Sequence, residues 1–359
     1  MDSDKLRAFW AARQGLDGSL GAADPAEVLA RTGWARSAGG FNPYLTLFSR
    51  AGTGRRAADE EMAGGRIGEI PTVRGQAYVL PEEDYGLGLR TSEPAARAEV
   101  RASERHGVDH RLLDKVVEVL YEAIGDTPTD LSDLDLAGLL PEGEAGEHTR
   151  LAALALLQTA GAIRRVPLEG RLDRPEHGYT RWADPPPEPE GEDARLALAE
   201  RYWAWIGAAS LEHFRRFSGL SEAAARSAVE PLGLHRQVDG DLLIRDVDEF
   251  GDYTPPRTPS YALVSALDGL HRLRHDLGAV LDPEHAGLRG LPAQPVFDRG
   301  RVVGFWNFDA DDGTIAWTTW TRPDDALYEA VERAETFIRD ELADVRGTAP
   351  DSVRPHALV

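Results

Sequence analysis

The chain has 359 residues, of which 42% are hydrophobic and 28% are charged, and its net charge is −21. This length predicts about two to four domains of soluble character, and no apolar run approaches the roughly 18 residues of a membrane-spanning helix. The absence of cysteine excludes disulfides, thiolate metal sites and cysteine nucleophiles. The N-terminus lacks a basic segment followed by an apolar stretch, so we expect no signal peptide and a cytoplasmic location.

The negative charge is unevenly distributed along the chain. Residues 1–95 contain 11 Lys or Arg and 13 Asp or Glu, so most of the excess acid lies after them. An acidic surface repels DNA at long range, because nucleic-acid affinity depends largely on cations that contact phosphates. A DNA-binding surface therefore requires a local basic region, and the nearly neutral first segment is the first candidate.

The first segment, residues 1–95, is predicted to contain helices followed by a hairpin. The helices are expected over residues 5–16, 25–31, 43–50 and 57–64. Asp24 is expected to cap the second of them, with proline in its first turn. Residues 67–80 are predicted to form a two-stranded ribbon that turns near Arg74 and Gly75. Helices followed by such a ribbon are typical of a winged-helix domain.

Two further segments, residues 96–184 and 185–254, are predicted to repeat this plan. In the earlier one we expect helices at 112–123, 131–140 and 149–161, then strands at 163–172 and 178–182. In the later one we expect helices at 194–206, 211–217 and 222–232, then a hairpin over 234–244 that turns at Asp239 and Gly240. Ser210 and Ser221 are expected N-caps. A proline-rich acidic linker at 183–193 separates the two segments.

The pattern changes after residue 254 from helices to short strands. Strands are predicted at 260–267, 294–297, 301–308 and 314–321, with a helical insert at 269–280 and a closing helix at 324–345. We expect a small β-barrel-like domain over residues 255–345 and a mobile tail over residues 346–359. The predicted fold class is α+β, with three tandem winged-helix domains followed by this β domain and a C-terminal helix.

Two stretches, Asn42–Arg50 and Ile70–Pro81, resemble the first domain of the AlkZ/YcaQ-like winged-helix DNA glycosylases. Residues 13–16, 198–219 and 267–306 are similar, in order, to the N-terminal helix, third winged helix and C-terminal β domain of that family. The resemblance implies a C-shaped monomer, and we expect no cofactor. Such a protein would grip damaged duplex DNA and act on alkylated or crosslinked bases.

The loop over residues 32–41 departs from the family. Relatives carry a Gln-x-Gln or Gln-x-Asp pair there for the chemistry, and this chain carries neither, so it resembles a divergent member. Cleavage of an N-glycosidic bond requires a group that stabilises an oxocarbenium-like sugar and positions a water. The catalytic candidates are Glu69, Asn42 and Ser37. Asn42 is otherwise expected to cap the helix at Pro43, and Ser37 is a poor base without a partner.

Arginines near the predicted hairpins supply candidate phosphate contacts, because guanidinium groups suit phosphate geometry. The DNA-binding candidates are Arg36, Arg50, Arg55, Arg56, Arg74, Gln76, Arg164, Arg165, Arg171, Arg272 and Arg274. Three aromatic residues, Trp34, Phe41 and Tyr44, are expected to line a pocket. His271 and His275 have metal-ligand spacing, but no third ligand is apparent, so we expect no metal site.

Three functions remain open from the sequence. The first is excision of a damaged base by a rearranged site, or recognition of damaged DNA without cleavage. The second is noncatalytic binding of a small planar genotoxin or another ligand, which an acidic surface suits better than DNA. The third is a transcription-type winged-helix protein. The sequence leaves open whether the chain is an enzyme.

Overall fold

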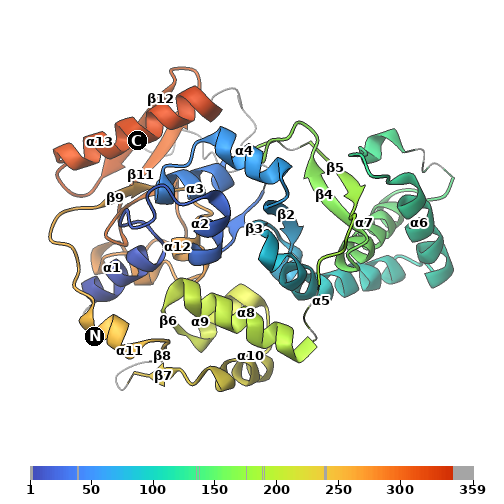
Figure 1. The fold of residues 1–359 in the computed structure, drawn as a ribbon, viewed down its shortest axis with the longest axis horizontal. Coiled ribbons are helices and arrows are strands. Elements are labelled where there is room, and N and C mark those ends of the chain that lie inside the picture. Colours follow the sequence, from blue (N-terminus) through green and yellow to red (C-terminus); the bar gives the residue numbers. More distant parts are fainter. Residues whose placement is uncertain are drawn as a thin grey trace.

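The computed structural model describes residues 3–342 except residues 39, 135, 137, 175, 188, 190 and 238–240 (Figure 1). The described residues form a mixed helix-and-strand structure with four sheets. No helix among them is both long and apolar enough to cross a membrane. The turn expected at Asp239 and Gly240, and the tail expected at 346–359, lie outside the described residues.

The first module confirms the predicted helices and hairpin. Its elements are α1 (Ser3–Arg13), α2 (Pro25–Thr32), β1 (Ala35–Arg36), α3 (Asn42–Ala51), α4 (Arg55–Ala63), β2 (Ile67–Pro71) and β3 (Ala77–Pro81). The Asp24 side chain accepts a hydrogen bond from the Glu27 amide at 2.8 Å, which is the expected N-cap. A single 3₁₀ turn at Val73–Gly75 joins β2 to β3, and the strand order is β1-β3-β2.

The second module is reached through a long helix that the sequence did not predict, α5 (Tyr85–Arg105). This helix runs through residue 95, where the first two domains were expected to meet. The module contains α6 (His110–Ala123), α7 (Glu144–Thr159), β4 (Ile163–Pro167) and β5 (His177–Arg181). The helix expected at 131–140 is wrong, because only a 3₁₀ turn at Leu131–Asp133 forms there. Asp130 starts this turn by accepting from the Ser132 amide.

The third module has the same strand order as the first. It contains α8 (Gly191–Ile206), β6 (Ala208–Ser210), α9 (Leu211–Ser218), α10 (Glu222–Val229), β7 (His235–Arg236) and β8 (Leu242–Ile244), and its sheet order is β6-β8-β7. Ser210 and Ser221 cap α9 and α10 as expected. In both modules the short strand that lies between two helices, β1 or β6, pairs with the last strand. In the second module one bridge, Thr129 to Tyr179, occupies that position.

The C-terminal region forms an open antiparallel sheet with the order β12-β11-β10-β9. Its elements are α11 (Val247–Asp252), β9 (Tyr261–Leu263), α12 (Gly269–Arg272), β10 (Gln294–Asp298), β11 (Arg301–Asp309), β12 (Thr314–Thr319) and α13 (Asp325–Phe337). The expected helical insert is shorter than predicted, because it contains only α12 and a turn at Gly278–Val280. A closing helix is present as α13, and a π-helical turn at Ile338–Leu342 follows it.

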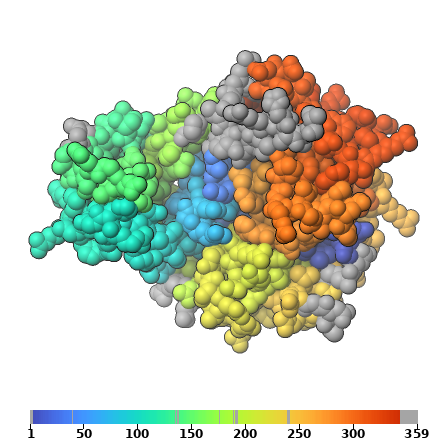
Figure 2. All heavy atoms as spheres, turned by 180° about the vertical axis from the view of Figure 1, so that it is seen from behind, coloured from blue at the N-terminus to red at the C-terminus, as the bar shows by residue number. Residues whose placement is uncertain are grey.

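The first module packs against other parts of the chain through two hydrophobic cores. One core joins it to α8–α10 and to part of the C-terminal sheet, and the other joins α3 to that sheet and α13. In the second core the rings of Phe48 and Phe337 stack at 4.1 Å. The second module has a core of its own, and it protrudes from the molecule in Figures 1 and 2. The first module therefore shares a core with both the third module and the C-terminal sheet.

Candidate nucleic-acid interface

The register of the first sheet divides its candidate residues between two faces. Arg36 pairs with Tyr78, and Tyr78 pairs with Ile70, so these three side chains share one face. The neighbouring row contains Ala35, Val79 and Glu69, which point to the opposite face because successive strand residues alternate. Arg36 and Glu69 therefore serve different surfaces.

The loop after β1 is held by backbone contacts. The Arg36 guanidinium donates from Nη1 to the carbonyls of Ser37 and Ala77 at 2.8 and 2.6 Å. Ser37 is 3% exposed, and its hydroxyl has no hydrogen-bond partner among the described residues. Asn42 is 1% exposed and donates from Nδ2 to the Arg36 carbonyl at 2.6 Å. The expected capping role of Asn42 is wrong, because this amide closes the loop instead.

Glu69 lies at the junction of the first two hairpins. Its Oε2 is 3.2 Å from Nε of Arg165 on β4, while Oε1 has no hydrogen-bond donor within the described part of the chain. The carboxylate lines a cavity of about 310 Å³ between the first hairpin, α5 and α7, together with Gln158 and Tyr179. Burial raises the pKa of the Tyr179 hydroxyl. A largely buried carboxylate, one of whose oxygens accepts no hydrogen bond, thus faces a partly open cavity.

A second cavity, of about 170 Å³, lies on the other side of the Glu69–Arg165 pair. Arg164 contributes to its wall and lies over the Trp182 ring at 5.2 Å. Asp59 also lines this cavity, but its carboxylate accepts from Tyr44 and pairs with Arg55 at 2.8 Å. Glu69 is therefore the carboxylate of the first module that keeps an oxygen available to either cavity.

At the tip of the first hairpin, arginines from three distant segments lie near one another. Arg74 donates from Nη1 to the Arg216 carbonyl at 3.0 Å, and Arg216 donates from Nη1 to the His275 carbonyl at 3.1 Å. Arg272, the exposed last residue of α12, acts electrostatically on both Tyr78 and His275. We call the three arginines Arg74, Arg216 and Arg272, together with the adjoining neutral His275, the cationic cluster.

The electrostatic neighbourhood of the cluster is reflected in its titratable groups. Partial burial and the charges of Arg272, Arg74 and Arg216 lower the pKa of His275 to about 4. Burial raises the pKa of Tyr78, and the charges of Arg36, Arg272 and Arg74 oppose that rise. Arg36 lies over the Tyr78 ring at 5.5 Å, and the Tyr78 hydroxyl donates to Oε1 of Gln76 at 3.4 Å. The surface is locally positive on a chain of net charge −21.

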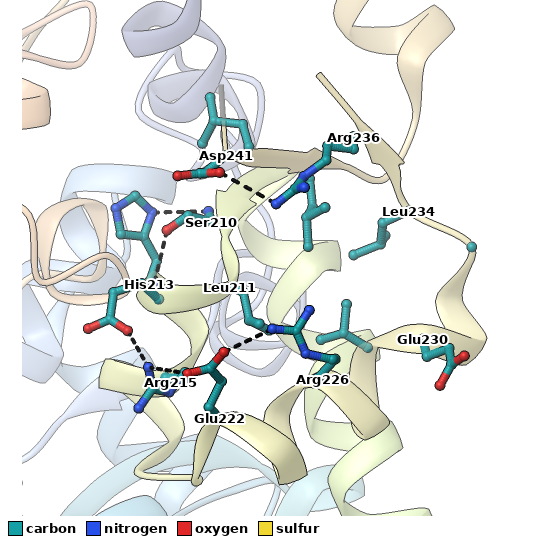
Figure 3. Close-up of a pocket in the computed structure, with 15 residues that line it drawn as sticks. Ser210, Leu211, His213, Arg215, Glu222, Arg226, Glu230, Leu234, Arg236 and Asp241 are labelled. Atoms are coloured by element: carbon teal, nitrogen blue, oxygen red, sulfur yellow. Dashed lines mark hydrogen bonds and ion pairs between the residues drawn. The ribbon is translucent and has the colours of Figure 1, made fainter. Parts of the chain in front are cut away.

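A cavity of about 800 Å³ in the third module has a different charge balance (Figure 3). Each of its three arginines has an acidic partner: Arg215 with Glu212 at 2.8 Å, Arg226 with Glu222 at 2.9 Å, and Arg236 with Asp241 at 3.4 Å. Glu230 adds another carboxylate to the lining. This cavity offers no excess positive charge for a polyanion.

Two predicted DNA contacts are wrong because their side chains are interior. Arg50 is 3% exposed and makes two bonds to the buried carboxylate of Asp268, at 2.8 and 3.0 Å. Arg274 is fully buried, lies over the Trp10 ring at 3.8 Å and donates to the Leu270 carbonyl. Neither guanidinium reaches solvent, so neither can contact a phosphate.

Three other predicted DNA contacts are paired with acids. Arg55 is 2.8 Å from Asp59, Arg56 is 2.8 Å from Glu60, and Arg171 is 2.6 Å from Asp173. These acids offset the charge that a phosphate would meet. Of the predicted DNA contacts, the structure brings Arg36, Arg74, Gln76 and Arg272 together. Arg164 and Arg165 lie by the Glu69 cavities instead.

The expected aromatic pocket is also wrong. Trp34 is 4% exposed, donates to Oδ2 of Asp84 at 2.8 Å and packs edge-on against Trp205. Phe41 and Tyr44 lie in the core beneath the C-terminal sheet. The Tyr44 hydroxyl donates to Asp59 and accepts from the Leu172 amide at 2.9 Å, and burial raises its pKa. These rings pack the hydrophobic cores of the protein.

Two members of the cationic cluster, Arg216 and His275, are not predicted as site residues from the sequence. Arg216 lies in a short amphipathic helix, and His275 was considered only for its spacing from His271. His271 is buried, and its Nε2 is hydrogen-bonded to the Ala266 carbonyl. The rings of His271 and His275 therefore lie in separate environments. No local pattern in the sequence indicates that residues 74, 216 and 275 meet.

Comparison with known proteins agrees with this architecture. The model of the AlkZ-like DNA glycosylase family matches residues 37–344. Among solved structures, the chain is similar to the DNA glycosylase AlkZ of Streptomyces sahachiroi, with a TM-score of 0.73 and 20% identity over 94% of this chain and 96% of that one. No curated protein matches it. The family implied by the sequence motifs is confirmed: the chain belongs to the AlkZ-like DNA glycosylases.

Proposed function

We propose that this protein binds duplex DNA and hydrolyses the N-glycosidic bond of an alkylated or crosslinked base, with Glu69 as the catalytic carboxylate. One observation carries the proposal: Glu69 is 5% exposed, lines a cavity of about 310 Å³ and keeps Oε1 unoccupied. A cavity of this size falls at the lower end of the range for small-molecule sites. The two other catalytic candidates, Ser37 and Asn42, are buried in and beside the loop after β1.

The chemistry would follow from charge and position. As the bond from the sugar to the base breaks, its electron pair leaves with the base and the sugar becomes an oxocarbenium-like cation. A carboxylate in a poorly solvated site stabilises that cation strongly. The same carboxylate would orient a water for attack on the sugar and accept its proton. Arg165 would compensate the charge of Glu69 before the substrate arrives.

The architecture supports a role on duplex DNA. We propose that the three modules are winged helices, since the first and third share one strand order and the second retains its single equivalent bridge. On this view α5 links the winged helices predicted over residues 1–95 and 96–184, and residues 185–254 form the third. We further propose that a monomer in the cytoplasm performs the reaction.

A noncatalytic reader of damaged DNA is the second candidate. It is favoured by one observation: the loop where the family carries its catalytic pair has no carboxylate or glutamine, and Arg36 is tied to its backbone. Binding of a genotoxin is less favoured, since Trp34, Phe41 and Tyr44, which would line its pocket, are core residues. It would have to use the Glu69 cavity.

Base release from alkylated duplex DNA tests the proposal. Glu69→Gln is expected to lower single-turnover release on the order of 100-fold, because it removes one strong transition-state interaction. DNA affinity should not fall, because the change removes no positive charge from the cationic cluster. Glu60→Gln is the matched control, since among the described residues Glu60 pairs only with Arg56, on an exposed helix face. Normal release by Glu69→Gln would reject Glu69, and binding without release by the wild type would identify a reader.

A further inference from the structure

We propose that Arg74, Arg216, Arg272 and His275 form an anion site that holds a backbone phosphate of DNA between the first and third modules. The proposal rests on the proposed function only in naming DNA as the source of the phosphate. Arg74 also lines the cavity that Glu69 faces, so the anion site adjoins the proposed catalytic carboxylate, while its other members come from α9 and from α12 and the residues after it.

The charge balance of the cluster favours an anion. Within the described residues, neither Arg74 nor Arg272 makes an ion pair, and the one carboxylate bound to the cluster is Glu212, at 3.0 Å from Arg216. Glu212 also pairs with Arg215 at 2.8 Å, so its charge is shared. Nearby Asp276 is 3.5 Å from His213. A phosphate would meet at least two uncompensated guanidinium groups.

The backbone of the cluster is held in an unusual conformation. Arg74 and His275 have φ values of 60° and 50°, two of four positive values at non-glycine residues in the described chain. The left-handed region costs such residues about 1–2 kcal/mol each, and strain of this kind concentrates at functional sites. Gly219 accommodates the Arg74 side chain, because a Cβ there would be 3.0 Å from Cγ of Arg74.

The cluster is also preorganised by its own hydrogen bonds. Arg74 bonds to the backbone of α9, and Arg216 of α9 bonds to the backbone after α12. Three segments separated by more than 50 residues are thereby fixed before a ligand binds. Guanidinium groups that are already ordered lose little freedom on binding, so more of their attraction for phosphate appears as affinity.

His275 gives the site a titratable reporter. Its ring is neutral at pH 7, because partial burial and three surrounding arginines, Arg272, Arg74 and Arg216, lower its pKa to about 4. A bound phosphate would neutralise that field and raise the pKa of His275. Binding would then take up a proton, so affinity would increase as the pH falls from 7 towards 5.

The test measures binding of a fluorescent duplex by anisotropy over a series of salt concentrations. The variants are Arg272→Gln, Arg74→Asn and His275→Asn; asparagine tolerates the left-handed conformation, so the backbone is preserved. The arginine variants are expected to weaken binding roughly 3- to 10-fold on any duplex sequence. The double variant Arg272→Gln/Arg74→Asn should reduce the magnitude of the negative slope of log K against log salt by about 0.9, which is the contribution of one phosphate. His275→Asn should abolish the pH dependence.

The matched control is Arg226→Gln in the same module, where the side chain pairs with Glu222 at 2.9 Å. It loses the same charge and should leave the slope unchanged. Equal slopes for the cluster variants and the wild type would overturn the proposal. The proposal would also be overturned if inorganic phosphate shifted the NMR signals of His275 while the cluster variants bound the duplex as tightly as the wild type. That result would identify a site for small anions. Glu69→Gln with normal DNA affinity but no base release keeps the two proposals distinguishable.

Discussion

Arg50 is predicted to stabilise the fold and not to bind DNA, because it is buried against an acidic partner. Its guanidinium makes two bonds to Asp268, at 2.8 and 3.0 Å, and one to Oε1 of Gln14 at 3.3 Å. Arg50→Met would leave the fully buried Asp268 carboxylate without a cation. Breaking a buried pair in this way costs about 3–5 kcal/mol, a large part of the roughly 5–15 kcal/mol that stabilises a typical protein.

Urea unfolding followed by tryptophan fluorescence measures this loss. The control is the double variant Arg50→Met/Asp268→Leu, which removes both charges and should recover most of the lost stability, because an apolar pair needs no compensation. A loss below about 1 kcal/mol for Arg50→Met would refute the buried-pair reasoning. A double variant as unstable as the sum of the singles would refute it too. The folded single variant should keep the wild-type salt dependence of DNA binding.

Two further predictions concern the second hairpin and a buried histidine. Leu172→Ala should cost about 2–5 kcal/mol and speed proteolysis of the hairpin, because Leu172 is 3% exposed in the core of the first module; wild-type resistance would contradict this. Burial lowers the pKa of His271 to about 4, below the usual value of about 6.5. The stability associated with its neutral ring is therefore fully present above pH 6.5. This stability is lost as the pH falls towards 4, because the unfolded chain then binds a proton that the folded protein does not. The urea midpoint of His271→Gln should therefore depend less on pH between 7 and 5, and identical profiles would rule out this role.

Local signals were sufficient to predict the parts of the fold that local interactions determine. Asp24, Ser210 and Ser221 cap the helices that their sequences indicated. Helix α5 was missed because it contains Gly86, Gly88 and Pro94, which weaken a helix in isolation. Tertiary packing explains the helix: a Cβ at Gly88 would lie 3.1 Å from side-chain atoms of Ile70 and Leu80. The close contact with the first hairpin requires the residue that local propensity disfavours.

The candidate site was harder to predict because burial and pairing are not local properties. Arg50 and Arg74 are the same residue type in neighbouring elements, yet one is neutralised by Asp268, 218 positions away, and the other has no acidic partner among the described residues. Arg216 and His275 become site residues only when α9 and the chain after α12 meet the first hairpin. Sequence reasoning could name the arginines near the hairpin, but could not assign them to core or surface.

The net charge of −21 changes how DNA affinity should be interpreted. Carboxylates more than about 8 Å from the duplex are largely screened at physiological ionic strength, but they repel it at low salt. This repulsion opposes the gain in affinity that phosphate contacts bring as salt decreases, so the wild-type slope alone underestimates the number of contacts. The repulsion is nearly the same in Arg272→Gln and Arg226→Gln, since each removes one positive charge. The difference between their slopes therefore isolates the local contribution of the cationic cluster.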